Sequence, residues 1–193
     1  MSRMPAIPYE DWAPELKAVS QSDFGLMPIL AHAPAIAVAV ARFQAELMAA
    51  STLPRRLLEL VRLRVAYRNQ CRTCMAVRYG DALDPHAGPE AVCALEKPLE
   101  SDLLSEAEKA AIHYADLMAT DHLAIDDAVI ARMRAHLSDA EIAELSVRIV
   151  SFVGFGRLLA TMHAVEHLPE DYRGDAGAEL FAPWRNSTIA LGA

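Results

Sequence analysis

Residues 57–74, LLELVRLRVAYRNQCRTC, join a helical pattern directly to a pair of cysteines. The apolar positions that would share one helix face are Leu57, Leu58, Val61 and Val65. This spacing predicts a helix over 54–68, with Asn69 as a natural stop. A turn after that stop places Cys71 near the amino end of a second helix, which we expect to run through Tyr79.

The same helical spacing recurs along most of the chain. Alternation of β-branched residues bounded by turn residues is nearly absent, so we expect an all-α fold. Ser51 or Thr52 is expected to cap the helix over 54–68. The further predicted helices are 34–50, with Pro34 in its first turn; 105–120, with Ser105 and Glu108 as a capping box; 126–136; and 138–167, with Ser138 and Glu141 as a second capping box.

Proline and glycine positions divide the chain into three parts. Residues 1–28 form a proline-rich arm with one short helix over 14–19, of a kind that often packs across a neighbouring subunit. Residues 29–172 form the helical domain, and residues 173–193 form an irregular tail. A chain of 193 residues with 53% apolar content can bury one sizeable core.

Charge and hydropathy argue against several classes of partner. The net charge of −8 disfavours nucleic acid and anionic lipid, which are bound through clustered Lys and Arg. The start of the chain lacks the basic region and apolar run of a secretory signal, and no window approaches the roughly 20 apolar residues of a membrane helix. We expect a cytoplasmic protein that acts on a small molecule, without nucleic acid, membrane or cofactor.

Cys71 and Cys74 form a C-x-x-C unit, which in a cytoplasmic protein indicates metal binding or catalysis more readily than a structural disulfide. A structural zinc site needs four ligands, and this chain has no companion pair at suitable spacing. His163, Glu166 and His167 match the inverted zinc-protease pattern, but the match is short and we interpret it as coincidence. We therefore expect no metal site.

Redox chemistry is the leading hypothesis, because two thiols three residues apart can open and close a disulfide. On one helix, Cys71, Cys74 and Arg78 would line a single face. A helix amino terminus and a nearby cation both lower the pKa of a thiol and so favour the nucleophilic thiolate. The third cysteine, Cys93, lies in an apolar run and is predicted to be buried and inert.

Glu59 has two interpretations. A carboxylate held among apolar groups could have a raised pKa and exchange a proton with a peroxide or a leaving thiolate. Alternatively, Glu59 forms an ordinary ion pair with Arg55 or Arg62, which lie four and three residues away. Taken alone, the sequence favours the ion pair.

Glu59, followed after eleven residues by Cys71-x-x-Cys74, resembles the core of the AhpD-like, carboxymuconolactone decarboxylase superfamily. The resemblance extends over about 29–172 and implies an all-helical homo-oligomer, commonly a trimer or hexamer. It also implies that Cys74 attacks a hydroperoxide, that Cys71 resolves the product as a disulfide, and that Glu59 belongs to a proton relay. The family places a histidine four residues after the second cysteine, where this chain has Arg78.

The sequence therefore predicts a thiol-dependent hydroperoxide reductase, with peroxiredoxin-like antioxidant activity, that an unidentified thiol reductant renews. Glu59 would handle the proton, and Arg78, which stays charged near neutral pH, would hold the thiolate or an anionic substrate group. Two alternatives remain open. One is a decarboxylase-like or lactone-binding enzyme, which does not depend on a thiol pair, and the other is a non-catalytic helical oligomer whose cysteines sense oxidation.

Overall fold

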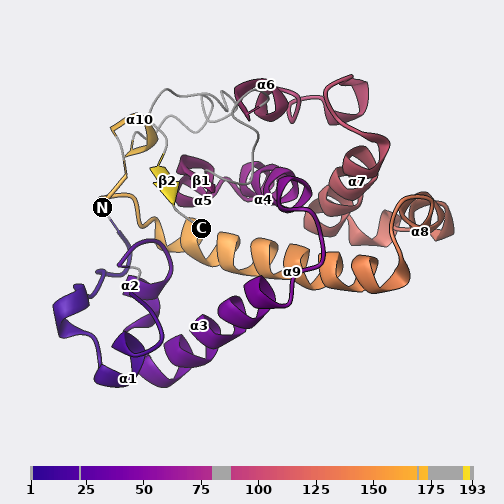
Figure 1. The fold of residues 1–193 in the computed structure, drawn as a ribbon. Coiled ribbons are helices and arrows are strands. Elements are labelled where there is room, and N and C mark those ends of the chain that lie inside the picture. Colours follow the sequence, from indigo (N-terminus) through magenta and orange to yellow (C-terminus); the bar gives the residue numbers. More distant parts are fainter. Residues whose placement is uncertain (1, 22, 80–87, 169, 174–188, 192–193) are drawn as a thin grey trace.

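The computed structural model describes residues 2–21, 23–79, 88–168, 170–173 and 189–191 (Figure 1). Its α-helices are α1 (Pro14–Lys17), α2 (Met27–Leu30), α3 (Pro34–Ala49), α4 (Arg55–Asn69), α5 (Arg72–Ala76), α6 (Gly88–Cys93), α7 (Glu106–Thr120), α8 (Asp127–Arg134), α9 (Asp139–Met162) and α10 (Glu170–Arg173). Short 3-10 turns lie at Tyr9–Asp11, Pro98–Glu100 and His122–Ala124. The predicted all-α class is confirmed.

Two three-residue strands are a small addition to this helical fold. β1 (Val77–Tyr79) and β2 (Ile189–Leu191) pair in parallel, with Arg78 opposite Ala190. The pairing joins the segment after the cysteines to a segment more than 100 residues later in the chain. The predicted helix through Tyr79 is therefore wrong, because α5 ends at Ala76 and the chain continues as a strand.

α4 lies at the centre of the packing, against α7 and α9 (Figure 1). Leu60 and Leu63 of α4, Ile112 of α7 and Ile149 of α9 are fully buried in one apolar cluster. Each such side chain contributes about 1.5–3 kcal/mol when it leaves water. This packing fixes the carboxyl end of α4, from which the cysteine segment departs.

Both predicted capping boxes are confirmed. Ser105 Oγ accepts the N–H of Glu108 at 3.2 Å, and the Glu108 carboxylate accepts the N–H of Ser105 at 2.8 Å. Ser138 and Glu141 repeat the arrangement at the start of α9. Each pair satisfies backbone donors that a helix start would otherwise leave without a partner.

The predicted cap of α4 is wrong, because α4 begins after Pro54 without a side-chain cap. The hydroxyls of Ser51 and Thr52 donate instead to the carboxylate of Glu144 on α9, at 2.9 and 2.7 Å. Burial raises the pKa of Glu144, but the hydrogen bonds from Thr52, Ser51 and Arg148 lower it to about 2. The loop between α3 and α4 is thus tied to α9.

The N-terminal arm packs against its own chain, and its expected packing across a neighbouring subunit stays a prediction. Trp12 and Leu16 are buried beside Ala37 and Ala41 of α3. The indole N–H of Trp12 donates to the carbonyl of Ile7 at 2.9 Å, which closes the arm around this small cluster. The arm and α3 lie on the opposite side of α9 from α4 and α7 (Figure 1).

α9 crosses the whole molecule and ends earlier than predicted (Figure 1). The sequence pattern reached His167, but His163 adopts the left-handed conformation, with φ of 51°, and ends the helix after Met162. By length and composition alone, α9 meets the criteria for a membrane-spanning helix, contrary to the sequence expectation. Core helices of globular proteins meet the same criteria, and α9 packs along α4 and α7.

Candidate redox site

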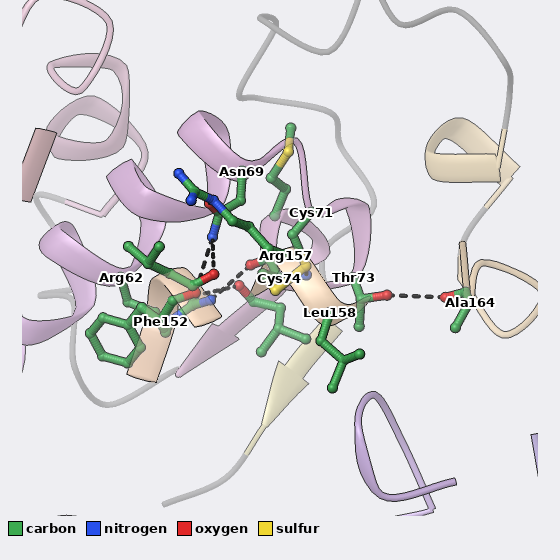
Figure 2. Close-up of a disulfide and its surroundings, with 12 residues drawn as sticks. Arg62, Asn69, Cys71, Thr73, Cys74, Phe152, Arg157, Leu158 and Ala164 are labelled. Atoms are coloured by element: carbon green, nitrogen blue, oxygen red, sulfur yellow. Dashed lines mark hydrogen bonds between the residues drawn. A yellow bond between two sulfur atoms is a disulfide. The ribbon is translucent and has the colours of Figure 1, made fainter. Parts of the chain in front are cut away.

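Cys71 and Cys74 form a disulfide at the start of α5, with their Cα atoms 5.2 Å apart (Figure 2). The chain reaches this position because Gln70 adopts the left-handed conformation, with φ of 52°, and ends α4. Cys71 then occupies the N-cap of α5, where its Sγ accepts the N–H of Cys74 at 3.2 Å. Cys71 is 1% exposed, whereas Cys74 is partly exposed, so the two sulfurs differ in access.

The cysteine segment is tied to α9 and the residues just after it (Figure 2). Before Cys71, the amide of Asn69 donates to the carbonyls of Phe152 and Val153, at 3.0 and 3.3 Å. Between the cysteines, the hydroxyl of Thr73 donates to the carbonyl of Ala164 at 3.1 Å. These bonds fix the redox segment relative to α9.

Gly156 permits the close approach of Asn69 to α9. A Cβ atom on Gly156 would lie 2.5 Å from the side-chain nitrogen of Asn69, well inside van der Waals contact. Arg157 holds the other end of the same amide, since its Nε donates to the side-chain oxygen of Asn69 at 3.2 Å. The Asn69 side chain therefore has little freedom to move away.

Glu59 and Arg62 form a buried ion pair beside the disulfide. Nε and Nη2 of Arg62 donate to the two carboxylate oxygens of Glu59, at 2.6 and 2.7 Å, and Glu59 is 3% exposed. Burial lowers the pKa of Arg62, but the charge and hydrogen bonds of Glu59 outweigh burial and raise it. The predicted ion pair of Glu59 is confirmed, with Arg62 as the partner, and its exchange of a proton with a peroxide or thiolate stays a prediction.

Arg62 also connects α4 to the redox segment through backbone carbonyls. Its Nη1 donates to the carbonyl of Cys74 at 2.7 Å, and its Nη2 donates to the carbonyl of Val77 at 2.9 Å. Its guanidinium lies 5.2 Å from the centre of the Tyr79 ring, and the Tyr79 N–H donates to Glu59 at 3.3 Å. One arginine thus orients the carboxylate, the end of α5 and the start of β1.

A pocket of about 280 Å³ opens onto Cys74. Its aromatic walls come from the arm, from β1 and from α9: Phe24, Tyr79, Phe152 and Phe155. Arg62 lines the same pocket, and Gln44, Thr73 and Ser151 add neutral polar groups. Cys71, Glu59 and Arg78 are not among the described residues of its lining. The structure thus brings Cys74 and Arg62 together at one apolar cavity.

Arg78 does not share a helix face with the cysteines, because it lies on β1 beyond the end of α5. Its Nη1 donates to the carbonyls of Met75 and Val77, the second at 2.8 Å. Burial raises the pKa of Tyr67 to about 12, although the charge of Arg78 and a side-chain hydrogen bond from Arg78 act to lower it. The predicted roles of Arg78 at a thiolate or an anionic substrate stay predictions.

Two other sequence expectations differ from the structure. Cys93 is exposed, because α6 directs it outward while its neighbours Val92 and Ala94 are buried, so the prediction of a buried thiol is wrong. His163 lies at the end of α9. The ring of His167 packs edge-on against the ring of Phe24, with the ring centres 4.5 Å apart. The two histidines of the short zinc-protease pattern therefore do not lie on one helix.

Sequence reasoning missed most of the pocket wall. Phe24, Phe152 and Phe155 come from segments far from the cysteines, and no local motif marks them. Arg62 carried a usable signal, since a charged residue three positions after Glu59 interrupts an otherwise apolar run. The spacing predicts Arg62 only as an ion-pair partner of Glu59, whereas in the structure it also lines the pocket.

Comparison with known proteins gives a family match and a fold match. Residues 34–117 match the Carboxymuconolactone decarboxylase family. Two uncharacterized proteins from two strains of Mycobacterium tuberculosis are each 39% identical over 94 residues, which are 48% of this chain and 32% of theirs. The chain thus spans about a third of the length of these curated relatives.

A solved structure from Ralstonia eutropha, described as an alkylhydroperoxidase AhpD core and an uncharacterized peroxidase-related protein, has the same fold. Its TM-score is 0.69 at 17% sequence identity, over 89% of this chain and 94% of that one. The likeness shows the fold, and the family match covers the helix and the cysteines that carry the motif. The chain is thus similar to the Carboxymuconolactone decarboxylase family over residues 34–117, and its fold is that of the AhpD core.

Proposed function

We propose that this protein reduces small organic hydroperoxides with the dithiol of Cys71 and Cys74. The observation that carries the proposal is the unequal access of the two sulfurs. Cys74 lines an apolar pocket, whereas Cys71 is buried behind it within reach of a disulfide. A peroxide that enters the pocket meets Cys74, and the oxidised sulfur then meets Cys71.

The reaction balances with two thiols for each hydroperoxide. The Cys74 thiolate bonds to the distal oxygen, the O–O bond breaks, and the proximal oxygen leaves with a proton as an alcohol. The thiol of Cys71 attacks the resulting sulfenic acid and expels water, which forms the disulfide. An external thiol reductant, still unidentified, then returns two electrons and two protons to the pair.

Glu59 and Arg78 complete the proposed chemistry. The carboxylate of Glu59, buried beside the end of α5, would accept the proton of the thiol and return it to the leaving oxygen. Arg78 follows Cys74 by four residues and would favour the thiolate or an anionic substrate through its charge. Because arginine does not exchange its proton near neutral pH, Glu59 would manage the proton alone.

Consumption of cumene hydroperoxide by the reduced protein, with thiols counted before and after, tests the proposal. Wild type should lose two thiols for each peroxide, and Cys74→Ser should consume none. Cys93→Ser is the matched control, because it removes the exposed thiol outside the pair and should leave turnover unchanged. In Cys71→Ser, the sulfenic acid on Cys74 should persist and react with dimedone. An inert wild type would refute the peroxidase.

The family match supports a second candidate, a carboxymuconolactone decarboxylase-like reaction. Such a reaction does not need a thiol pair, so its turnover should survive Cys74→Ser. The redox-sensing alternative predicts a third result. The Cys74→Ser protein would then lose an oxidation-dependent change in assembly, although neither protein would consume peroxide.

We also infer that the protein is a homo-oligomer, with a trimer or hexamer as the expected state, and that α3 and α9 carry its interface. Large apolar side chains are exposed along these helices, with Phe43 at 41%, Val147 at 45% and Val150 at 58%. They border an apolar groove of about 550 Å³. Ser151 and Phe155 line both this groove and the redox pocket, so a second copy seated there would also border the site.

A further inference from the structure

We propose that Arg62 is a catalytic residue that donates a hydrogen bond to the leaving oxygen of the hydroperoxide. The inference rests on the proposed peroxidase activity and names a group that the family motif does not mark. Arg62 is the one charged side chain among the described residues that line the pocket, and Cys74 lines the same pocket. The reacting sulfur and this cation therefore face one bound substrate.

Among the described residues, the hydrogen bonds of Arg62 leave one of its N–H donors without an acceptor. A guanidinium has five N–H groups. Two of them bind Glu59, one binds the carbonyl of Val77, and one on Nη1 binds the carbonyl of Cys74. The second N–H on Nη1 has no acceptor in the part of the chain that the structure describes. The same nitrogen, Nη1, also donates to the backbone carbonyl of Cys74. The second N–H therefore lies close to the residue that attacks the peroxide.

The surroundings of Arg62 suit electrostatic catalysis. The ion pair and the two carbonyls hold the guanidinium in place, so little reorganisation is needed when charge develops on the substrate. The aromatic and aliphatic walls of the pocket lower the local dielectric, which strengthens an interaction between a cation and a developing anion. Arginine also stays protonated throughout the working pH range.

The assigned step follows the movement of charge. As Sγ of Cys74 bonds to the distal oxygen, the electron pair of the O–O bond moves to the proximal oxygen. The second N–H on Nη1 of Arg62 donates to this oxygen while negative charge grows on the oxygen. The proton that Glu59 took from the thiol then completes the alcohol, and Arg62 keeps all of its protons.

Arg78 is less suited to this role in the structure. It lies on β1, outside the described lining of the pocket, and donates to the carbonyls of Met75 and Val77. The sequence suggested Arg78 as the cation of the site, because it follows Cys74 by one helical turn. The end of α5 at Ala76 removes that relation.

The test compares two rates: the reaction of Cys74 with a hydroperoxide, and the alkylation of the Cys74 thiolate. Arg62→Lys keeps the positive charge but loses the planar donor. We expect its rate constant with cumene hydroperoxide to fall about 100-fold or more, in the range found when one such donor is removed. Alkylation of Cys74 by iodoacetamide across pH should change less than about threefold, because it needs the thiolate but no leaving-oxygen donor.

Arg64→Lys is the matched control on the same helix. Arg64 makes a similar bidentate pair with Asp116, at 2.7 Å for both bonds, and also donates to the carbonyl of Leu95. It does not belong to the described lining of the pocket, so its loss should leave the peroxide rate within about threefold. Circular dichroism of both variants checks that each is folded.

A second variant keeps the test decisive. The peroxide rate of Arg62→Ala should recover at least tenfold with millimolar guanidinium chloride and not with tetramethylammonium chloride. If wild type consumes peroxide and Arg62→Lys retains its rate, the role of Arg62 is refuted while the peroxidase stands. Parallel losses in the peroxide and alkylation rates would place Arg62 at the thiol and also refute the step. An inert wild type overturns both proposals.

Discussion

Replacement of Glu59 by glutamine should destabilise the fold strongly. The change keeps the size of the side chain but removes the negative charge opposite Arg62. Both members of this pair are poorly exposed, with side chains 2% and 11% accessible. The variant therefore leaves a cation inside the protein without its counter-charge, and this cost adds to any effect on chemistry.

The expected loss of unfolding free energy is about 3 kcal/mol. Breaking a buried ion pair by removing one partner costs about 3–5 kcal/mol. The lower end applies, because the glutamine oxygen can still accept one hydrogen bond, and Arg62 keeps its bonds to the carbonyls of Cys74 and Val77. For a domain of this size, a loss of 3 kcal/mol corresponds to a fall in Tm of about 6–12 °C.

Urea unfolding followed by circular dichroism gives the measurement, with the disulfide oxidised and the protein concentration fixed for all variants. Glu106→Gln is the control, because Glu106 pairs with Lys109 at the same spacing but is 61% exposed. We expect the control to lose much less stability than Glu59→Gln, because water screens the exposed pair. The reasoning would be refuted if the two variants lost equal unfolding free energy, or if Glu59→Gln lost under about 1 kcal/mol. Burial of the Glu59–Arg62 pair would then not determine the cost of breaking it.

Three further predictions test the contacts of α9. Gly156→Ala should destabilise the protein by about 1–3 kcal/mol through its clash with Asn69. Gly154→Ala, with nothing within 4 Å of the new Cβ, should stabilise it by up to about 1 kcal/mol. Changes of the same sign in the free energy of unfolding of the two variants would contradict this account. The pKa of Glu144 is lowered to about 2, so its contribution to stability is complete above pH 4.5 and is lost as the pH falls toward 2. The stability difference between wild type and Glu144→Gln should therefore be smaller at pH 3 than at pH 7, and an unchanged difference would refute the shift. Val150→Glu should reduce the oligomeric mass measured by light scattering, and an unaltered mass would exclude this face as the interface.

The sequence predicted the helices where the determining interactions are local. The capping boxes that start α7 and α9 need only residues three positions apart, and both were correct. The end of α9 was wrong because His163 takes a left-handed conformation that usually indicates glycine or asparagine. The end of α5 was wrong because Val77 pairs with a strand more than 100 residues away, and no local pattern contains that pairing.

In the candidate site too, features set by local sequence were predicted and features set by tertiary contacts were not. Spacing alone identified Cys71 and Cys74, and the resemblance to a known family added Glu59. The three-residue separation from Glu59 identified Arg62 as a possible ion-pair partner. The exposure of Cys93 was not predictable from its apolar neighbours, because one turn of α6 decides which of them face outward. The walls of the pocket depend on tertiary contacts and had no signal in the sequence.

The reacting residues and the aromatic wall of the pocket lie in different parts of the chain, which limits what relatives can reveal about the substrate. The family match over 34–117 includes Arg62 and Cys74, which would carry out the chemistry. Phe24, Phe152 and Phe155 lie outside it, although they form most of the aromatic wall that a substrate would touch. Relatives that share only the matched region would therefore share the residues of the proposed reaction without sharing the aromatic wall. Substrate preference should follow the arm and α9, so changes to these aromatic residues should alter KM more than the rate of Cys74 alkylation.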